Sequence, residues 1–336
     1  MFKNKSIFVT GATGSFGKAF IAHIIKYYPN FKRLVVFSRD ELKQFEMSKL
    51  DKFKHPNIRM FLGDIRDKDR LERALEDIDI VVHAAALKQV PAAEYNPFEF
   101  IKTNVIGTQN LVEACIDKRV KKVIALSTDK ASSPINLYGA TKLCADKLIL
   151  SANNIKGKKD ISFSVVRYGN VTGSRGSVVP FFLKKNFNKE KLPLTHYDMT
   201  RFNISLKESI ELVLTAIKFG VGGEIFVPKL KSFYIRDLIE AITKKNKFYK
   251  IVGIRPGEKI HEELINDAEI KDTVSCKDHY VVLSNFSENQ ILRYCKKNNY
   301  KKVNKNFSYN SGTNSNFMTL KELKKIVSSF SKNIIS

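Results

Sequence analysis

The sequence of 336 residues contains no tryptophan and few cysteines. Cys115, Cys144, Cys276 and Cys295 have neither CxxC pairs nor the spacing of a disulfide scaffold, and the six histidines lack metal-ligand spacing, so we expect no metal site. No apolar run approaches the roughly 20 residues that span a bilayer, and the N-terminus lacks the shape of a cleavable signal peptide. These absences predict a cytoplasmic protein without membrane association.

Acidic residues are also scarce, at 34 against 58 Lys and Arg, which gives a formal net charge of +24. The basic residues are spread over the chain in short, interrupted clusters, whereas nucleic-acid binding concentrates them on one helix or patch. The charge pattern therefore favours a solvated surface and no nucleic-acid partner. A positive field of this kind would also attract anionic ligands such as nucleotides and sugar nucleotides.

The first half alternates short β-branched runs with helical patterns, which is typical of a parallel α/β sheet. We predict a Rossmann-type doubly wound parallel sheet with helices on both faces, followed by a smaller C-terminal α/β substrate-binding domain. The cofactor domain is expected to cover 1–172, with about 200–228 packing back onto it, and the substrate domain 173–199 and 229–336. The predicted strands lie at 6–10, 34–37, 58–62, 80–84, 123–126, 162–167 and 224–227, and the helices at 16–27, 69–75, 103–117 and from Tyr138 onward.

Glycines at GxxGxxG spacing directly follow the first predicted strand. Such a turn lets the backbone approach a pyrophosphate at a helix N-terminus. A plain strand-to-helix turn is the alternative, but an apolar strand precedes the loop and an amphipathic helix follows it. The spacing resembles that of extended short-chain dehydrogenases/reductases. The predicted cofactor contacts in this loop are Gly11, Thr13, Gly14, Ser15, Phe16 and Gly17.

The end of the second predicted strand should distinguish NAD from NADP. Ser38, Arg39 and Lys43 can form a clamp for a 2′-phosphate, which favours NADP. Asp40 and Glu41, which precede Leu42, allow a ribose contact or a charged helix start instead. Farther along the chain, Asp64 and Ile65 resemble the superfamily's adenine-binding turn, and Ala84, Ala85 and Ala86 its small-residue strand end.

Tyr138 and Lys142 form a YxxxK pair that places both side chains on one helix face. An ammonium beside a phenol lowers the pKa of the tyrosine and makes it a useful base. Thr128 takes the hydroxyl position that completes the superfamily's triad. Asp129 and Lys130 follow at the strand end and suggest further proton transfers; in an extended segment their side chains would point to opposite faces.

Longer strings carry a closer resemblance, from residue 8 to about 262. Together they resemble the UDP-N-acetylglucosamine 4,6-dehydratases that invert C5, the first enzymes of pseudaminic acid biosynthesis, which supplies flagellin glycosylation. The strings are SRDELK at 38–43, HAAALKQVP at 83–91, AEYNP at 93–97, STDKA at 127–131, NLYGATKLC at 136–144, RYGNV at 167–171, GSRGSVVPFF at 173–182, MTRF at 199–202 and IRPGEK at 254–259.

The resemblance implies NADP as cofactor, UDP-N-acetylglucosamine as substrate and a homo-oligomer, from dimer to hexamer. Tyr138 would deprotonate the C4 hydroxyl, Lys130 would take the C5 proton and Asp129 would protonate the departing C6 hydroxyl. Lys142 would hold the nicotinamide ribose. The further cofactor contacts that the family implies are Lys88, Asn104, Val171, Thr172, Gly173, Ser174 and Arg175, and its substrate contacts are Lys88, Asn170, Arg175, Val178, Thr195, Arg255 and Glu258.

Two other readings stay open at this point. A C5-retaining 4,6-dehydratase or a 4-epimerase would use the same glycine loop and YxxxK pair. A non-enzymatic NADP-sensing protein would keep the fold, but the presence of Asp129, Lys130, Tyr138 and Lys142 disfavours it.

Overall fold

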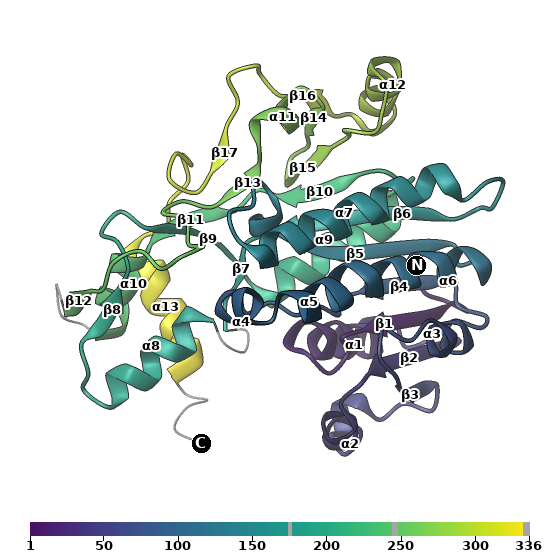
Figure 1. The fold of residues 1–336 in the computed structure, drawn as a ribbon, viewed down its shortest axis with the longest axis horizontal. Helices are drawn as coiled ribbons and strands as arrows, with labels where there is room; N and C mark the ends of the chain where they lie inside the picture. The colour runs from purple at the N-terminus through teal and green to yellow at the C-terminus, as the bar shows by residue number, and fades with distance from the viewer. Residues whose placement is uncertain (174–176, 244–247, 332–336) are drawn as a thin grey trace.

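A computed structural model describes residues 1–173, 177–243 and 248–331, and a 10-stranded sheet dominates this part of the chain (Figure 1). Its strand order is β16-β14-β15-β10-β6-β5-β4-β1-β2-β3, and the pairs from β10 to β3 are all parallel. These parallel strands are β1 (Ser6–Thr10), β2 (Arg33–Ser38), β3 (Ile58–Leu62), β4 (Ile80–His83), β5 (Lys122–Thr128), β6 (Ser162–Tyr168) and β10 (Ile225–Pro228).

Helices cover both faces of this sheet (Figure 1). Helix α1 packs against α9 on one face, and α3, α6 and α7 pack in a row on the other. Four of them, α2, α3, α7 and α9, begin at a residue whose side chain caps the helix; Asn136 accepts a bond of 2.7 Å from Gly139 N at the start of α7. The helices are α1 (Ser15–Tyr27), α2 (Glu41–Ser48), α3 (Lys68–Ala74), α4 (Val90–Tyr95), α5 (Pro97–Phe100), α6 (Gly107–Asp117), α7 (Leu137–Ile155) and α9 (Leu206–Phe219), with short helical turns η1 (Asp51–Phe53), η2 (Ile101–Ile106) and η3 (Asp129–Ala131).

The predicted fold class is confirmed, and the strands of the first half match within about two residues. The prediction differs at the helix expected over 103–117, because residues 101–106 form the π-helical turn η2 before α6 begins. Asn104 is buried in this turn. Irregular turns of this kind are frequent at functional sites.

A second hydrophobic core lies beside the sheet, at the left of Figure 1. Side chains such as Phe182, Leu194, Leu238 and Val327 build it. The elements around it are α8 (Val178–Phe187), β8 (Leu192–Leu194), β9 (Thr200–Ile204), β11 (Lys231–Tyr234), α10 (Ile235–Thr243), β12 (Tyr249–Ile251) and α13 (Leu320–Ser331), and β9 also pairs with the short strand β7 (Asn170–Val171).

The last third of the chain is shared between the two cores, whereas the sequence analysis placed all of 229–336 in the substrate domain. Val274, Val281 and Tyr309 belong to the core of the large sheet, because β15 pairs antiparallel with β10 and extends it. The elements of this returning part are β13 (Glu263–Ile265), α11 (Asp267–Ile270), β14 (Thr273–Ser275), β15 (His279–Val282), α12 (Glu288–Asn298), β16 (Lys301–Lys302) and β17 (Tyr309–Asn310).

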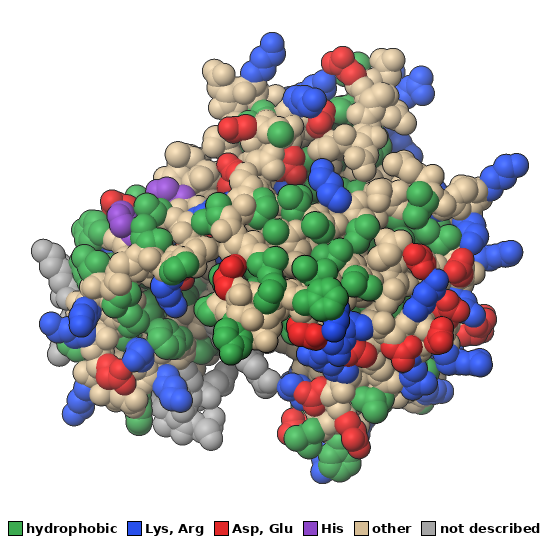
Figure 2. Space-filling view, in the orientation of Figure 1, with side chains coloured by type: hydrophobic (Ala, Val, Ile, Leu, Met, Phe, Trp, Pro, Cys, Tyr) green, Lys and Arg blue, Asp and Glu red, His purple; other side chains and the backbone are tan. Residues whose placement is uncertain are grey.

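Basic side chains are scattered over the face seen in Figure 2, where they alternate with acidic ones. This distribution fits the solvated surface that the charge pattern favoured. Among the described residues, no helix has the length and apolar character needed to cross a membrane.

Candidate active site

A cavity of about 560 Å³ opens at the carboxyl ends of the parallel strands, where ligands bind in open α/β sheets. Most of the predicted site residues line it. They are Gly11, Thr13, Gly14, Ser15, Phe16, Gly17, Ser38, Arg39, Asp64, Ile65, Ala84, Ala85, Ala86, Lys88, Thr128, Lys130, Tyr138, Lys142, Asn170, Val171 and Val178.

The glycine loop leaves no room for side chains. Gly11 has φ +60°, and a Cβ atom there would lie 2.7 Å from the carbonyl oxygen of Ala84. A Cβ atom on Gly17 would lie 2.5 Å from the carbonyl oxygen of Ala12. The two glycines therefore allow the loop to pack closely against the end of β4 and against itself, and Gly14 stands at the start of α1 without a side-chain cap. The N-terminus of a helix suits a phosphate.

The second strand end contributes less to the cavity than the sequence predicted. Ser38 and Arg39 line it, and Ser38 Oγ lies 2.9 Å from Thr13 Oγ1 in the glycine loop. Asp40 instead caps α2 by accepting a bond of 2.9 Å from Lys43 N, and its carboxylate pairs with the Lys43 ammonium. The predicted contacts Asp40, Glu41, Leu42 and Lys43 do not line the cavity.

Tyr138 and Lys142 enter the cavity from the first turns of α7. Lys142 Nζ donates a bond of 2.8 Å to the carbonyl oxygen of Leu126, and burial lowers the pKa of this lysine. Burial raises the pKa of Tyr138 to about 12, and the cation that opposes this shift is Lys130. The YxxxK pattern predicted that Lys142 would lower the pKa of Tyr138; the pKa is raised instead, because burial outweighs the opposing charge of Lys130.

Asp129 and Lys130 lie together, which contradicts the prediction that their side chains point to opposite faces. Because β5 ends at Thr128 and η3 begins at Asp129, the backbone is no longer extended there, and both side chains lie on the same side. Asp129 Oδ1 accepts bonds from Lys130 Nζ (3.1 Å) and Thr128 Oγ1 (2.9 Å). Asp129 is fully buried, and Lys130 alone of the two lines the cavity.

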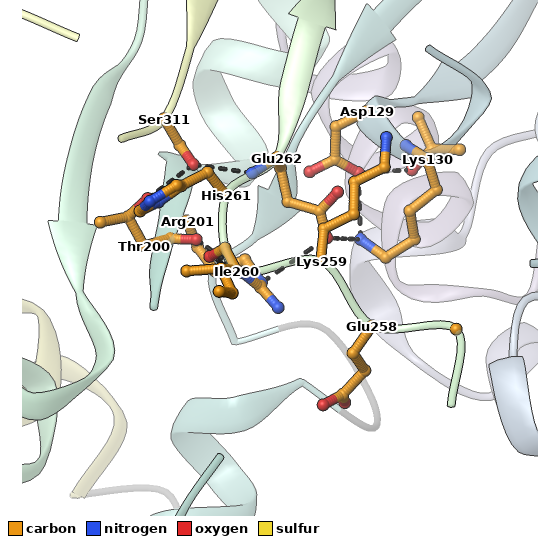
Figure 3. Close-up of polar contacts among 12 residues, drawn as sticks. Asp129, Lys130, Thr200, Arg201, Glu258, Lys259, Ile260, His261, Glu262 and Ser311 are labelled. Carbon is orange, nitrogen blue, oxygen red and sulfur yellow. Dashed lines mark hydrogen bonds and ion pairs between the residues drawn. The ribbon is translucent and has the colours of Figure 1, made fainter. Parts of the chain in front are cut away.

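Two further charged residues that sequence analysis missed complete this group (Figure 3). Glu262 Oε1 lies 3.2 Å from Lys130 Nζ, and Arg201 Nε lies 3.7 Å from the same carboxylate oxygen. We call Asp129, Lys130, Arg201 and Glu262 the Lys130 cluster. Arg201 lies within the matched string at 199–202, and Glu262 lies just after the string at 254–259; this was the only signal in the sequence.

The charged groups of this cluster shift the pKa values of one another. The pKa of Lys130 is raised: burial alone would lower it, but Asp129 and Glu262 outweigh burial. Burial raises the pKa of Asp129, and Glu262 adds to this shift while Lys130 opposes it. Burial would also raise the pKa of Glu262, but Lys130 and Arg201 bring it below its ordinary value.

Several predicted contacts lie outside the cavity. Arg255 is exposed and its Nε lies 3.2 Å from Glu258 Oε1, and Thr195 is buried elsewhere. Asn104 acts behind the lining by bonding Leu87 and Thr141. Thr172 and Gly173 follow the lining residue Val171 without entering the cavity wall. Ser174 and Arg175 fall outside the residues that the structure describes.

The cavity also has lining residues that the sequence analysis did not single out as contacts. Most come from strand ends and the loops beside them, and about half lie within the matched strings. They are Phe37, Gly63, Leu87, Gln89, Thr103, Leu126, Ser127, Tyr168, Gly169, Ser177 and Leu206. Among the described residues, no group of His, Cys, Asp or Glu is placed to hold a metal ion.

Known proteins resemble this chain over nearly its whole length. A family model described as "Polysaccharide biosynthesis protein" matches residues 7–284. A UDP-N-acetylglucosamine 4,6-dehydratase (inverting) of Campylobacter jejuni is 48% identical, covering 97% of this chain and 98% of that protein. A UDP-glucose 4-epimerase of Rickettsia massiliae is 40% identical over 83% of each chain. Pen from Bacillus thuringiensis, a solved structure, is 37% identical with a TM-score of 0.88, covering 98% of both chains.

Proposed function

Because the chain belongs to the polysaccharide biosynthesis protein family, we propose that it is a UDP-N-acetylglucosamine 4,6-dehydratase that inverts C5. The observation that carries this proposal is that Lys130 lines one cavity with Tyr138 and the glycine loop, while the buried Asp129 carboxylate accepts a bond from its ammonium. An epimerase needs only a residue that exchanges a proton at O4, whereas dehydration also needs a base at C5 and an acid at the C6 oxygen. The similarity to the C. jejuni enzyme supports the same reading.

NADP is the cofactor that we propose, and the residues present fit a dinucleotide. The glycine loop lines the cavity at the N-terminus of α1, a place that suits a pyrophosphate, and Arg39 can meet a 2′-phosphate. A bound nicotinamide would accept the hydride from C4 and later return it to C6. NAD is the alternative; with Asp40 committed to capping α2, no acidic residue of 40–41 lines the cavity to hold a ribose.

The chain's own residues would then divide the proton transfers. Tyr138 removes the proton of the C4 hydroxyl, and the ketone that results acidifies the neighbouring C5–H bond. Lys130, as the free amine, takes the C5 proton. Asp129, as the acid, gives a proton to the C6 oxygen, which leaves as water while the C5=C6 bond forms. Lys142 positions the ribose from the floor of the cavity.

The amine and the acid can arise from the ion pair that the structure contains. Moving one proton from Lys130 Nζ to Asp129 Oδ1, which are 3.1 Å apart, leaves a neutral amine beside a carboxylic acid. No proton enters or leaves the site in this step. After elimination Lys130 is again an ammonium and Asp129 again a carboxylate.

Product analysis tests this function. The protein is incubated with UDP-N-acetylglucosamine and NADP⁺ in deuterated water, and the product is examined by NMR. We expect a 4-keto-6-deoxy sugar with deuterium at C5 and the L-arabino configuration. Retention of the D-configuration would make it a C5-retaining dehydratase. A product that keeps its C6 hydroxyl and is inverted at C4 would make it an epimerase, the activity named for the Rickettsia relative.

The place of this reaction in pseudaminic acid biosynthesis, the cytoplasmic location and the homo-oligomer stay predictions. The oligomeric state can be measured directly by sedimentation of the purified protein.

A further inference from the structure

Lys130 is held by two carboxylates that come from distant parts of the chain (Figure 3). Asp129 precedes it in η3, and Glu262 lies just before β13. Both carboxylates are almost fully buried, and one oxygen of each, Asp129 Oδ2 and Glu262 Oε2, has no hydrogen-bond partner. A buried carboxylate with an unpaired oxygen depends on its remaining ion pair.

The backbone of Glu262 is fixed independently of Lys130. Its N–H donates to Ser311 Oγ (2.9 Å), and its carbonyl accepts from Ser311 N (2.8 Å). Nearby, Lys259 Nζ donates a bond of 2.9 Å to the carbonyl oxygen of Ser132, beside η3. The carboxylate therefore reaches Lys130 from a backbone segment that two hydrogen bonds to Ser311 hold in place.

We propose that Glu262 is a positioning residue that keeps one proton shared between Asp129 and Lys130. This inference rests on the proposed function, in which the shared proton supplies both the acid and the base of the elimination. A pair that has lost this proton keeps its amine but has no acid for the C6 oxygen. Glu262 prevents the loss because its negative charge favours the protonated form of both neighbours.

Other charged groups face Lys130 as well. Arg201 approaches from β9 and opposes protonation, and Tyr138 faces it from α7. Lys259 acts on the Glu262 carboxylate. Replacing Glu262 by glutamine leaves Lys130 with the single carboxylate of Asp129 and takes the paired carboxylate away from Arg201. The pKa of Lys130 then falls, so the pair loses its proton at a lower pH.

The test compares Glu262→Gln with a matched control, Glu263→Gln. Glu263 is the next residue and bonds Ser133 Oγ (2.8 Å), in the same loop as η3, but it does not touch Lys130. Competitive labelling with acetic anhydride across a pH series, followed by peptide mass spectrometry, reports when the Lys130 amine is unprotonated. We expect the half-labelling pH to fall by about one unit or more in Glu262→Gln, the scale of one close charge, and to stay in place in Glu263→Gln.

Product formation is measured on the same samples. The pH above which the protein no longer removes the C6 hydroxyl should fall by the same amount in Glu262→Gln. Glu262→Asp should bring this pH part of the way back. An unchanged labelling pH, or a shifted labelling pH with an unshifted dehydration profile, overturns the proposal. Circular dichroism shows whether Glu262→Gln folds. If it does not, Glu262→Asp alone tests the proposal, and its half-labelling pH should fall by a smaller amount. Labelling needs no substrate, so an error in the proposed function shows separately, in the product.

Discussion

Two buried groups of charge in this protein share one arrangement, a cation between two carboxylates, in very different settings. The Lys130 cluster lies at the cavity. The second, which we call the Arg167 cluster, consists of Asp146, Arg167 and Glu269 and lies between β6, α7 and α11. Arg167 NH1 bonds both oxygens of Glu269 (3.0 and 2.8 Å), and its NH2 lies 3.5 Å from Asp146 Oδ2. Each cluster draws one carboxylate from the short segment 262–269.

The difference lies in the cation. A guanidinium remains charged at any pH that a protein experiences, and it binds carboxylates through a rigid fork. A buried lysine can lose its proton, and Lys130 is also the one that reaches the cavity. The same arrangement of two carboxylates around a cation therefore fixes the fold in one place and can move a proton in the other.

The largest effect on stability should follow from Arg167→Ala. This change leaves Asp146 and Glu269 without their shared cation, and breaking a buried pair in this way costs about 3–5 kcal/mol. Urea unfolding followed by circular dichroism measures the loss. Lys5→Ala, which removes an exposed partner of Asp79, is the control and should cost at most about 1 kcal/mol. Equal losses in the two variants would contradict a structural role for the Arg167 cluster.

Lys130→Ala should affect turnover more than stability. Arg201 still faces Glu262, whereas the buried carboxylate of Asp129 loses its cation and can become neutral by binding a proton. Product formation should fall at least ~10²-fold, the scale of one general base. Because Tyr138 and Lys142 remain, single-turnover absorbance should show reduced cofactor accumulating without elimination. It should accumulate more slowly than in the unmodified protein, since Lys130 no longer opposes the rise in the pKa of Tyr138. Normal turnover in this variant would remove Lys130 from the mechanism.

A solvent-exposed pair at the cavity mouth provides a third point of comparison. Arg39 lies 3.8 Å from Asp64 and is half exposed, so it contributes little to the fold. We expect NADP⁺ to bind more tightly than NAD⁺, and Arg39→Ala to weaken NADP⁺ binding by about 1.5–3 kcal/mol. Calorimetric titration with both cofactors gives the two affinities. Equal affinities in the unmodified protein would mean that the 2′-phosphate is not recognised.

His83 is a buried titratable group without a carboxylate partner, and it shows how the stability of such a site depends on pH. Its ring bonds Thr10 Oγ1 (2.8 Å) and Thr108 Oγ1 (3.2 Å), and burial, helped by Lys142, lowers its pKa from 6.5 to about 3. Between these values the unfolded chain binds a proton that the folded protein does not. His83 therefore removes up to about 1.4 kcal/mol of stability per pH unit as the pH falls through this window.

Replacing this residue with Asn should make the unfolding free energy less dependent on pH between about 6 and 3, relative to the unmodified protein. Urea unfolding at a series of pH values measures both slopes. Parallel slopes would show that His83 is already protonated in the folded state.

Local patterns predicted the residues whose partners lie nearby in sequence. The glycine loop, the YxxxK pair and the parallel strands each depend on spacing within about 20 residues. Glu262 and Glu269 escaped prediction because their cations, Lys130 and Arg167, lie more than 100 residues earlier. Strands β14 and β16 are short and pair antiparallel at the edge of the sheet, so they lack the apolar run of a buried parallel strand. Asp129 was recognised, but its direction depends on η3, a turn that the strand pattern did not predict.

The return of residues 262–310 to the large sheet has a consequence for synthesis. Chains are made and fold from the N-terminus, so β1 to β10 leave the ribosome before the segment that completes them. Until Glu269 emerges, Arg167 has only Asp146, and until β15 emerges one edge of β10 is bare. A nascent chain ending near residue 230 would therefore expose an apolar strand edge, which is prone to pair with other chains. We expect the cofactor-binding half to reach its stable form only when the last third of the protein has been translated.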